Sequence, residues 1–503
     1  MIRTTTLLLA GVLALQAVFH PVQAETIDKF SSVKIPGALT GYVDLVYRPT
    51  IFLSIPKLTT ENCPDYLSRE QALQDLEMIN CLFDDAYSGR FYWENHGVNF
   101  PEVYKNISDY IGSVDRVSVA EIEKILADGF SGIIDGHFAF CGNKMHTFYR
   151  HKNACFSDLL VEKKGNDYVV IQSGVSGVIA GDLVTDAQRG KFLFQTLAAS
   201  SREQFLIGTL SYEKIDSITI GFSSGNRKLF LHDCRINESD NGGEVFAVSE
   251  REGVPVVRVS TFDFGYDQKL TEYAEYGKIL KDKSCFVVNL LSNQGGSDTY
   301  SEEFVTNLNG CAHLRLYYAA LSSPPVMQSW ANLDLENSPD YIQEIILNAR
   351  KEVETLKKKP VVQWEVEDDS GQQTGNYQGK ALFLSNRRSA SASEDTLLYS
   401  ESIPNAVIVG ENSGGVATFG EVREYELPNS RIRFLIPSKI LLTPGLEEGV
   451  GYLPDYWLDS SEPVKEAAAW LKHPESYQFR LEIPAAVEGI DFERWEDADR
   501  SCR

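Results

Sequence analysis

Residues 381–394 read ALFLSNRRSASASE, and this stretch decides the fold that the sequence predicts. The apolar residues 381–384 predict a buried strand, residues 385–388 a turn, and residues 389–394 the start of a helix. The same alternation runs through the chain beyond residue 253, with strands predicted at 254–260, 285–290, 380–384 and 406–410 and helices at 270–281, 300–308 and 394–402. Strands that alternate with helices favour an α/β layered core.

Two regions with different patterns precede this core. Residues 61–130 predict helices, and the helix over 69–79, capped by Ser68, would bury one stripe made of Ala72, Leu73, Leu76 and Ile79. Residues 141–250 contain short strand-like runs separated by turn residues. We therefore predict an arm and helical domain at 25–140, a β-rich domain at 141–250, and the core at 251–503 with an insert at 325–379.

Composition bounds the possible functions. The chain has 503 residues, of which 43% are hydrophobic and 11% aromatic, so it can bury sizeable cores. It carries 47 Lys and Arg against 71 Asp and Glu, a formal net charge of −24. A general electrostatic grip on nucleic acid or on anionic lipid needs a basic face, so we expect neither as a partner.

The first 24 residues have the pattern of a secretory signal peptide. A positive start at Met1–Arg3 precedes an apolar run at 7–19 and a small-x-small site that ends at Ala24. An uncleaved membrane anchor is the alternative. No later stretch has 18 consecutive apolar residues. We expect an exported protein, periplasmic or extracellular, whose mature chain does not insert into a membrane.

Cysteine usage agrees with export. The eight cysteines could form four disulfides in an oxidising compartment, and closeness in sequence favours Cys63–Cys81 and Cys141–Cys155; buried free thiols are the alternative. No pair has the CxxC spacing of a zinc or thioredoxin-type site. We expect no metal and no other cofactor.

The serine-rich turn is the first candidate for chemistry. A serine there can present its hydroxyl at the edge of the sheet, and the first helical N–H groups favour a developing oxyanion; an ordinary helix cap is the alternative. The paired glycines Gly295 and Gly296 follow a predicted strand and allow backbone N–H groups to approach a substrate oxygen. His137 is a candidate base, and Glu447 and Glu448 supply carboxylates that could orient it.

Three motifs together resemble peptidase family S41, which includes the tail-specific (C-terminal processing) proteases, the tricorn core protease and interphotoreceptor retinoid-binding protein. They are SASASE at 389–394, the NxGG motif at 293–296, and the GxxPD-like segment at 451–455. The likeness extends to Asp135-Gly136-His137 and to a PDZ-like Gly181-Asp182. It implies a crotonase-like or ClpP-like catalytic core and a β-rich, PDZ-like domain.

The resemblance also implies roles for individual residues. The nucleophile of the family is the middle serine of the motif, here Ser391. Ala392 would supply one oxyanion N–H, and Gly295 or Gly296 the other. The lysine of the tail-specific branch would stand 25 residues after the serine, where this chain has Val416, so the serine–lysine dyad is missing.

The chain is instead similar to the tricorn branch, in which a histidine acts as the base. His137 matches that histidine, and Glu448 matches the late glutamate, with Glu447 as its close rival. The branch has a serine before the histidine where this chain has Gly136, and the usual DLR before NxGG is Asn289-Leu290-Leu291 here.

The implied function is that of an exported serine endopeptidase. It would hydrolyse protein or peptide substrates through a Ser-His-Glu site and an acyl-enzyme intermediate. The alternative is a non-catalytic protein that binds a ligand or peptide on the same scaffold.

Overall fold

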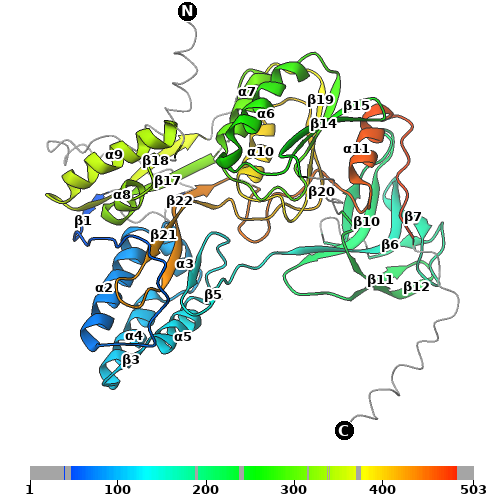
Figure 1. Cartoon of the computed structure of the whole chain (residues 1–503). Helices are drawn as coiled ribbons and strands as arrows, with labels where there is room; N and C mark the ends of the chain where they lie inside the picture. The colour runs from blue at the N-terminus through cyan, green and yellow to red at the C-terminus, as the bar shows by residue number, and fades with distance from the viewer. Residues whose placement is uncertain are drawn as a thin grey trace, which may run out of the picture.

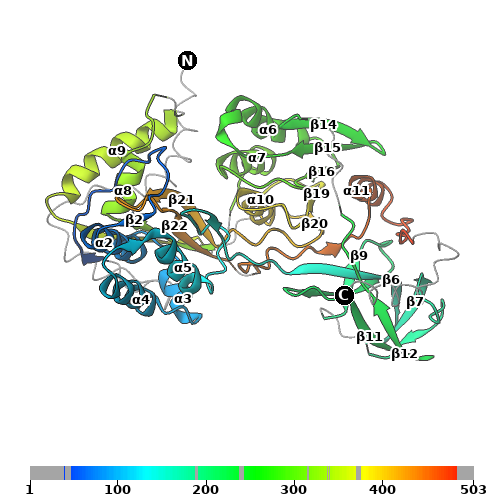
Figure 2. The same cartoon turned by 60° about the horizontal axis from the view of Figure 1, so that its bottom comes forward.

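The computed structural model describes residues 39, 47–186, 191–236, 243–313, 316–336, 338, 340–369, 375–443 and 445–483. The predicted signal peptide, Cys502 and part of the predicted arm lie outside these residues. Figures 1 and 2 show an α/β layered centre, with a lobe of helices and an antiparallel sheet on one side and a β-rich part on the other. Among the described residues, no helix is long and apolar enough to cross a membrane.

The centre is built on parallel strands, in the order β15 (Val254–Val259), β16 (Cys285–Asn289), β19 (Lys380–Ser385), β20 (Ala406–Gly410) and β23 (Tyr456–Trp457). The strand β14 (Phe246–Arg251) pairs antiparallel at the edge. The helices between them are α6 (Asp267–Leu280), α7 (Thr299–Asn309) and α10 (Ala392–Ser400), with the short η4 (Phe264–Tyr266) before α6. The predicted α/β alternation is confirmed, with element ends shifted by a few residues.

Both faces of these strands are buried, which explains their nearly continuous apolar runs. Alternate residues along each strand, such as Phe286, Val288 and Phe383, point to one face of the sheet and pack with α6, α7 and α10. The residues between them, such as Val287 and Leu382, point to the opposite face and pack with α11 (Pro463–Lys472). The centre is therefore a sheet between two layers of helix (Figure 2).

The β-rich part is antiparallel and has a small core of its own. Its strands are β6 (Asn153–Lys164), β7 (Asp167–Ser173), β8 (Leu183–Val184), β9 (Leu193–Thr196), β10 (Gln204–Ser211), β11 (Ser217–Phe222), β12 (Gly225–Phe230) and β13 (His232–Asp233). It joins the central sheet through a parallel pairing of Thr196 with Trp457.

The lobe contains α2 (Arg69–Asp85), α3 (Arg90–Asn95), α4 (Phe100–Ser113) and α5 (Val119–Phe130), with a small ladder of β2 (Tyr66–Leu67) and β3 (Val117–Ser118). The side chain of Ser68 caps α2, as predicted, by accepting from Gln71 N over 3.2 Å. Leu73 was predicted on the buried stripe, but it is 47% exposed. The buried face of α2 turns toward Asp75, Met78 and Leu82 instead, which leaves Leu73 at its edge.

The predicted insert belongs to this lobe. Its helices α8 (Pro324–Ala331) and α9 (Asp340–Leu356) share a core with α2–α5. An antiparallel sheet completes the lobe, in the order β1 (Tyr47–Pro49), β18 (Val361–Asp369), β17 (Leu316–Ser322), β22 (Arg433–Leu442), β4 (Ala139–Cys141) and β5 (Met145–His146), with β21 (Phe419–Glu426) paired to β22. The strand β18 therefore lies within the predicted insert at 325–379.

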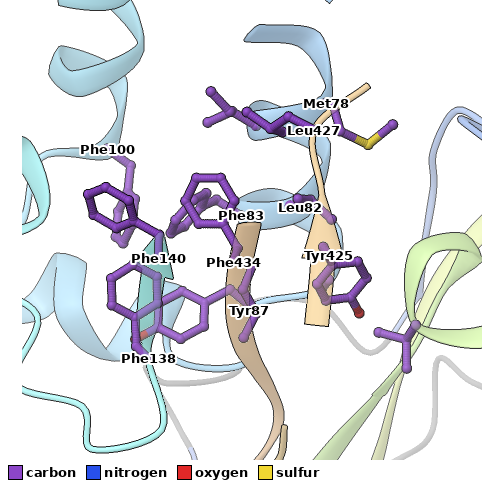
Figure 3. Close-up of a cluster of buried hydrophobic side chains, with 14 of the residues drawn as sticks. Met78, Leu82, Phe83, Tyr87, Phe100, Phe138, Phe140, Tyr425, Leu427 and Phe434 are labelled. Carbon is purple, nitrogen blue, oxygen red and sulfur yellow. The ribbon is translucent and has the colours of Figure 1, made fainter. Parts of the chain in front are cut away.

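An aromatic cluster fixes β4 against α2 and β22. Figure 3 shows Phe138 and Phe140 beside Phe83 and Phe434, and the rings of Phe83 and Phe434 are 5.7 Å apart. All four side chains are at most 1% exposed. The segment that precedes Phe138, which carries His137, is therefore anchored in a dense core.

Neither predicted disulfide is formed. Cys81 points along α2 toward Asp85, and Cys63 is also a free thiol. Cys141 lies on β4 and Cys155 on β6, in two different sheets. Closeness in sequence is a poor guide here because each pair is divided between separate elements.

Candidate active site

Three loops meet at one edge of the central sheet, because they follow the carboxyl ends of neighbouring parallel strands. They are residues 290–298 after β16, 386–391 after β19 and 411–418 after β20. Ligands of open α/β sheets bind at this edge. The NxGG and SASASE motifs both lie here, so this edge is the candidate active site.

Ser391 stands at the N-cap of α10 in a backbone conformation that side chains rarely adopt. Its φ of 55° and ψ of −124° lie outside the regions that L-residues favour. Such strain costs about 1–3 kcal/mol and persists where the surroundings enforce it, commonly at functional sites. Ser391 is only partly buried. The strain singles it out among the serines of the motif.

The two outer serines tie the loops together. The Ser389 hydroxyl donates to Leu290 O over 2.8 Å, and the Ser393 hydroxyl donates to Asn293 O over 2.7 Å. Both serines are fully buried. The loop after β16 is thus fastened on both sides of Ser391, which explains why the motif needs serine at alternate positions.

Gly295, the first glycine of the pair, lies against Ser391, and Gly296 lies against Phe262. A Cβ on Gly295 would stand 2.8 Å from Ser391 Cβ and 2.9 Å from Ala392 N, so only glycine fits there. The Gly295 N–H already donates to Asn293 Oδ1 over 2.9 Å. Within the described residues, no acceptor is bound to the N–H of Ala392 or of Gly296. These two groups are the donors available to a developing oxyanion.

His137 lies in the lobe, where a hydrogen bond from its backbone N–H fixes its position. Its N–H donates to Asp135 Oδ1 over 2.8 Å, and Tyr87 donates to Asp135 Oδ2 over 2.9 Å. The imidazole Nδ1 is buried without a hydrogen-bond partner. Burial lowers the pKa of His137 to about 4. The ring is therefore neutral near pH 7 and can accept a proton.

Glu448 and its rival Glu447 face opposite ways. Glu447 is exposed, whereas Glu448 is 5% exposed and accepts from Gly136 N over 2.9 Å and from Thr418 N over 3.2 Å. Burial raises the pKa of Glu448, and the charge of Asp135 raises it further. Glu448 therefore orients the backbone before His137 rather than the imidazole itself.

The predicted residues thus fall into two adjoining groups. One contains Ser391 with its glycine pair, and the other contains His137 with Glu448. Within the described residues, no hydrogen bond joins the side chains of Ser391, His137 and Glu448. No cluster of His, Cys, Asp and Glu in those residues could hold a metal ion.

Val416 connects the two groups. Its N–H donates to Glu394 Oε2 over 2.8 Å, and the same oxygen accepts from Ser391 N. Its Cγ1 would lie 2.1 Å from a Cβ on residue 136. The position where the other branch has a lysine is therefore filled by an aliphatic side chain that requires glycine at 136.

Sequence reasoning missed three residues of this site, namely Tyr87, Asp135 and Glu394. Asp135 and Glu394 stood inside quoted motifs, but their partners are far away in the chain. Tyr87, for example, reaches Asp135 across 48 positions. A motif marks such residues but does not say what they bind.

Comparison with known proteins finds one matching protein family. A family model described as peptidase family S41 matches residues 253–456. No curated protein matches the chain.

Three solved structures are similar to this chain at low identity. They are mature CPAF (14% identity, 81% of this chain and 95% of that chain, TM-score 0.41), the photosystem II D1 C-terminal processing protease (13%, 79% and 96%, TM-score 0.35), and the tricorn protease (11%, 81% and 37%, TM-score 0.32).

The matched residues 253–456 include Ser391, the glycine pair and Glu448, and they span the parallel strands of the centre from β15 to β23. The segment 253–456 therefore matches peptidase family S41.

Proposed function

We propose that this chain is an exported serine endopeptidase that cleaves protein or peptide substrates. The observation that carries the proposal is the strained Ser391 at the start of α10, packed against Gly295 and followed by Ala392, whose N–H has no acceptor within the described residues. An acyl-transfer site needs this pairing of a nucleophile with oxyanion donors.

The proposed reaction begins with transfer of the Ser391 hydroxyl proton to His137 as the serine oxygen attacks a peptide carbonyl. The N–H groups of Ala392 and Gly296, or of Gly295 if its bond to Asn293 opens, stabilise the oxyanion. His137 then protonates the leaving amine, and water releases the acyl-enzyme. Glu448 holds the backbone that carries the histidine.

The proposal requires Ser391 and His137 to approach each other when substrate binds. Catalytic hydrogen bonds are often long before substrate binds and shorten in the complex. The two residues belong to the centre and to the lobe, so a small closure of the lobe would shorten their separation. The neutral imidazole of His137, whose Nδ1 has no hydrogen-bond partner within the described residues, supports this role.

The surrounding architecture belongs to the same proposal. The core at 251–503 is crotonase-like or ClpP-like. The β-rich part at 141–250 is PDZ-like and captures peptide ends by adding them as a strand. Residues 1–24 direct export to the periplasm or the exterior, and residues 25–140 form the arm and helical domain.

Cleavage of an unstructured peptide library by residues 25–503, read by mass spectrometry, tests the proposal. Ser391→Ala should lose cleavage by several orders of magnitude. Ser113→Ala, at an exposed serine at the end of α4, is the control and should still cleave. Cleavage that survives in Ser391→Ala would overturn the assignment.

The alternative is a non-catalytic binding protein on the same scaffold. The lack of a hydrogen bond between Ser391 and His137 in the described residues favours it. Peptide binding without cleavage, by the wild type and by Ser391→Ala alike, is the result that would select it.

A further inference from the structure

We propose that Glu394 is a positioning residue, which sets Ser391 and the loop 413–416 as a single rigid unit. The inference rests on the proposed function only in calling Ser391 the nucleophile. The sequence marked Glu394 as the last residue of the SASASE motif, and the mechanism above gives it no part.

Four donors converge on this one carboxylate. Oε1 accepts from the Ser413 hydroxyl over 2.5 Å and from Gly415 N over 2.8 Å. Oε2 accepts from Val416 N over 2.8 Å and from Ser391 N over 3.1 Å. The side chain is completely buried. Each oxygen therefore binds at least one backbone N–H, whose direction is fixed by the chain.

The hydrogen bond from Ser391 N to Glu394 holds the backbone of Ser391. Ser391 occupies a conformation that a serine does not favour, so something outside it must hold it there. The Glu394 carboxylate fixes its N–H from one side, and Gly295 packs against its Cβ from the other. The hydroxyl direction is thus set by a side chain one turn further along the helix.

The bonds to the loop carry this constraint toward the other group of site residues. The carbonyl of Gly415 accepts from Gly449 N over 2.8 Å, which holds the segment just after Glu448. Val416 packs against Gly136, just before His137. One buried carboxylate thereby joins the nucleophile to both segments that carry the proposed base and acid.

Glu394→Gln is the decisive variant, because it keeps the shape and replaces one oxygen with an NH2 group. Whichever way the amide lies, its nitrogen faces a backbone N–H and one anchor is lost. Hydrogen exchange by mass spectrometry should then accelerate at least about tenfold in residues 388–396 and 412–417 together, as local opening becomes easier. Glu272→Gln, on the exposed face of α6, is the matched control and should change neither segment.

A second readout separates positioning from simple loss of stability. Inactivation by a fluorophosphonate should show a maximal rate about 10²-fold lower in Glu394→Gln, with the concentration for half-maximal rate retained, when both are measured well below the melting temperature. A merely structural glutamate would lower the melting temperature and leave this inactivation rate unchanged, which would overturn the proposal.

Ser413→Ala keeps the proposal testable if Glu394→Gln does not fold. It removes the hydroxyl that donates to Glu394 and accepts from Tyr452 N, and it leaves every residue of α10 unchanged. Faster exchange in residues 388–396 is the expected result, and unchanged exchange there would contradict the coupling. If the wild type does not react with the fluorophosphonate at all, the proposed function fails, while hydrogen exchange still decides the role of Glu394.

Discussion

Replacing His137 with glutamine tests whether the fold holds the imidazole neutral. Burial lowers the pKa of His137 from 6.5 to about 4. Because the folded pKa lies below that of the unfolded chain, the stability that the neutral ring contributes is fully present above pH 6.5 and is lost as the pH falls through about 4. The gap between 6.5 and about 4, at about 1.36 kcal/mol per pH unit, corresponds to about 3 kcal/mol.

Urea unfolding of the wild type and His137→Gln should be compared between about pH 7 and about pH 4, with midpoint and slope recorded at each pH. Relative to the wild type, the variant should gain about 3 kcal/mol as the pH falls over this range, because it has no ring to protonate. Carboxylates that titrate in the same range are common to both proteins and cancel in the difference.

His473→Gln is the control for this comparison, because His473 is exposed and should leave the acid dependence unchanged. The burial of His151, which lowers the pKa of that ring too, is present in every variant and also cancels. A difference between His137→Gln and the wild type that stays constant across the pH range would refute the reasoning. It would mean that the imidazole is solvated and is not held as a neutral base.

Three further predictions concern the contacts around the site. Gly295→Ala should lower the rate of peptide cleavage by about 10²-fold, because its Cβ would displace the serine turn; cleavage at the wild-type rate would contradict this packing. Gly136→Ala should cost about 1–3 kcal/mol of unfolding free energy through its clash with Val416, and adding Val416→Ala should recover at least about 0.5 kcal/mol in a double-mutant cycle; strict additivity would show that the two positions do not touch. Glu448→Gln should lower cleavage by about 10²-fold while the exposed Glu447→Gln leaves it unchanged, and the reverse ranking would exchange their roles.

Much of the centre could be predicted from the sequence, because its strands are buried on both faces and its helices lie between them at short range. The stretch 381–394 is a strand, a turn and a helix, as its pattern indicates. The place of residues 325–379 could not be predicted this way. Their helices pack on α2–α5, which end at residue 130, whereas α8 begins at residue 324, and periodicity carries no information about such distant partners.

Some residues of the candidate site could likewise be predicted from the sequence, and others could not. Ser391 and the glycine pair could be located because each stands in a short motif at the end of a predicted strand. The preference for Glu448 over Glu447 follows from burial, which adjacent glutamates in a glycine-rich loop do not reveal. The four bonds of Glu394 span up to 22 positions and come from three backbone N–H groups and a hydroxyl, so no pattern of side-chain types indicates them.

The most direct test of the central claim is covalent labelling of residues 25–503 with a fluorophosphonate, followed by intact-mass measurement and peptide mapping. A serine nucleophile activated by its surroundings should give a single adduct, on Ser391, and Ser391→Ala should give none. An adduct that maps to another residue, or that persists in Ser391→Ala, would contradict the assignment. The absence of any adduct in the folded wild type would contradict the catalytic role itself.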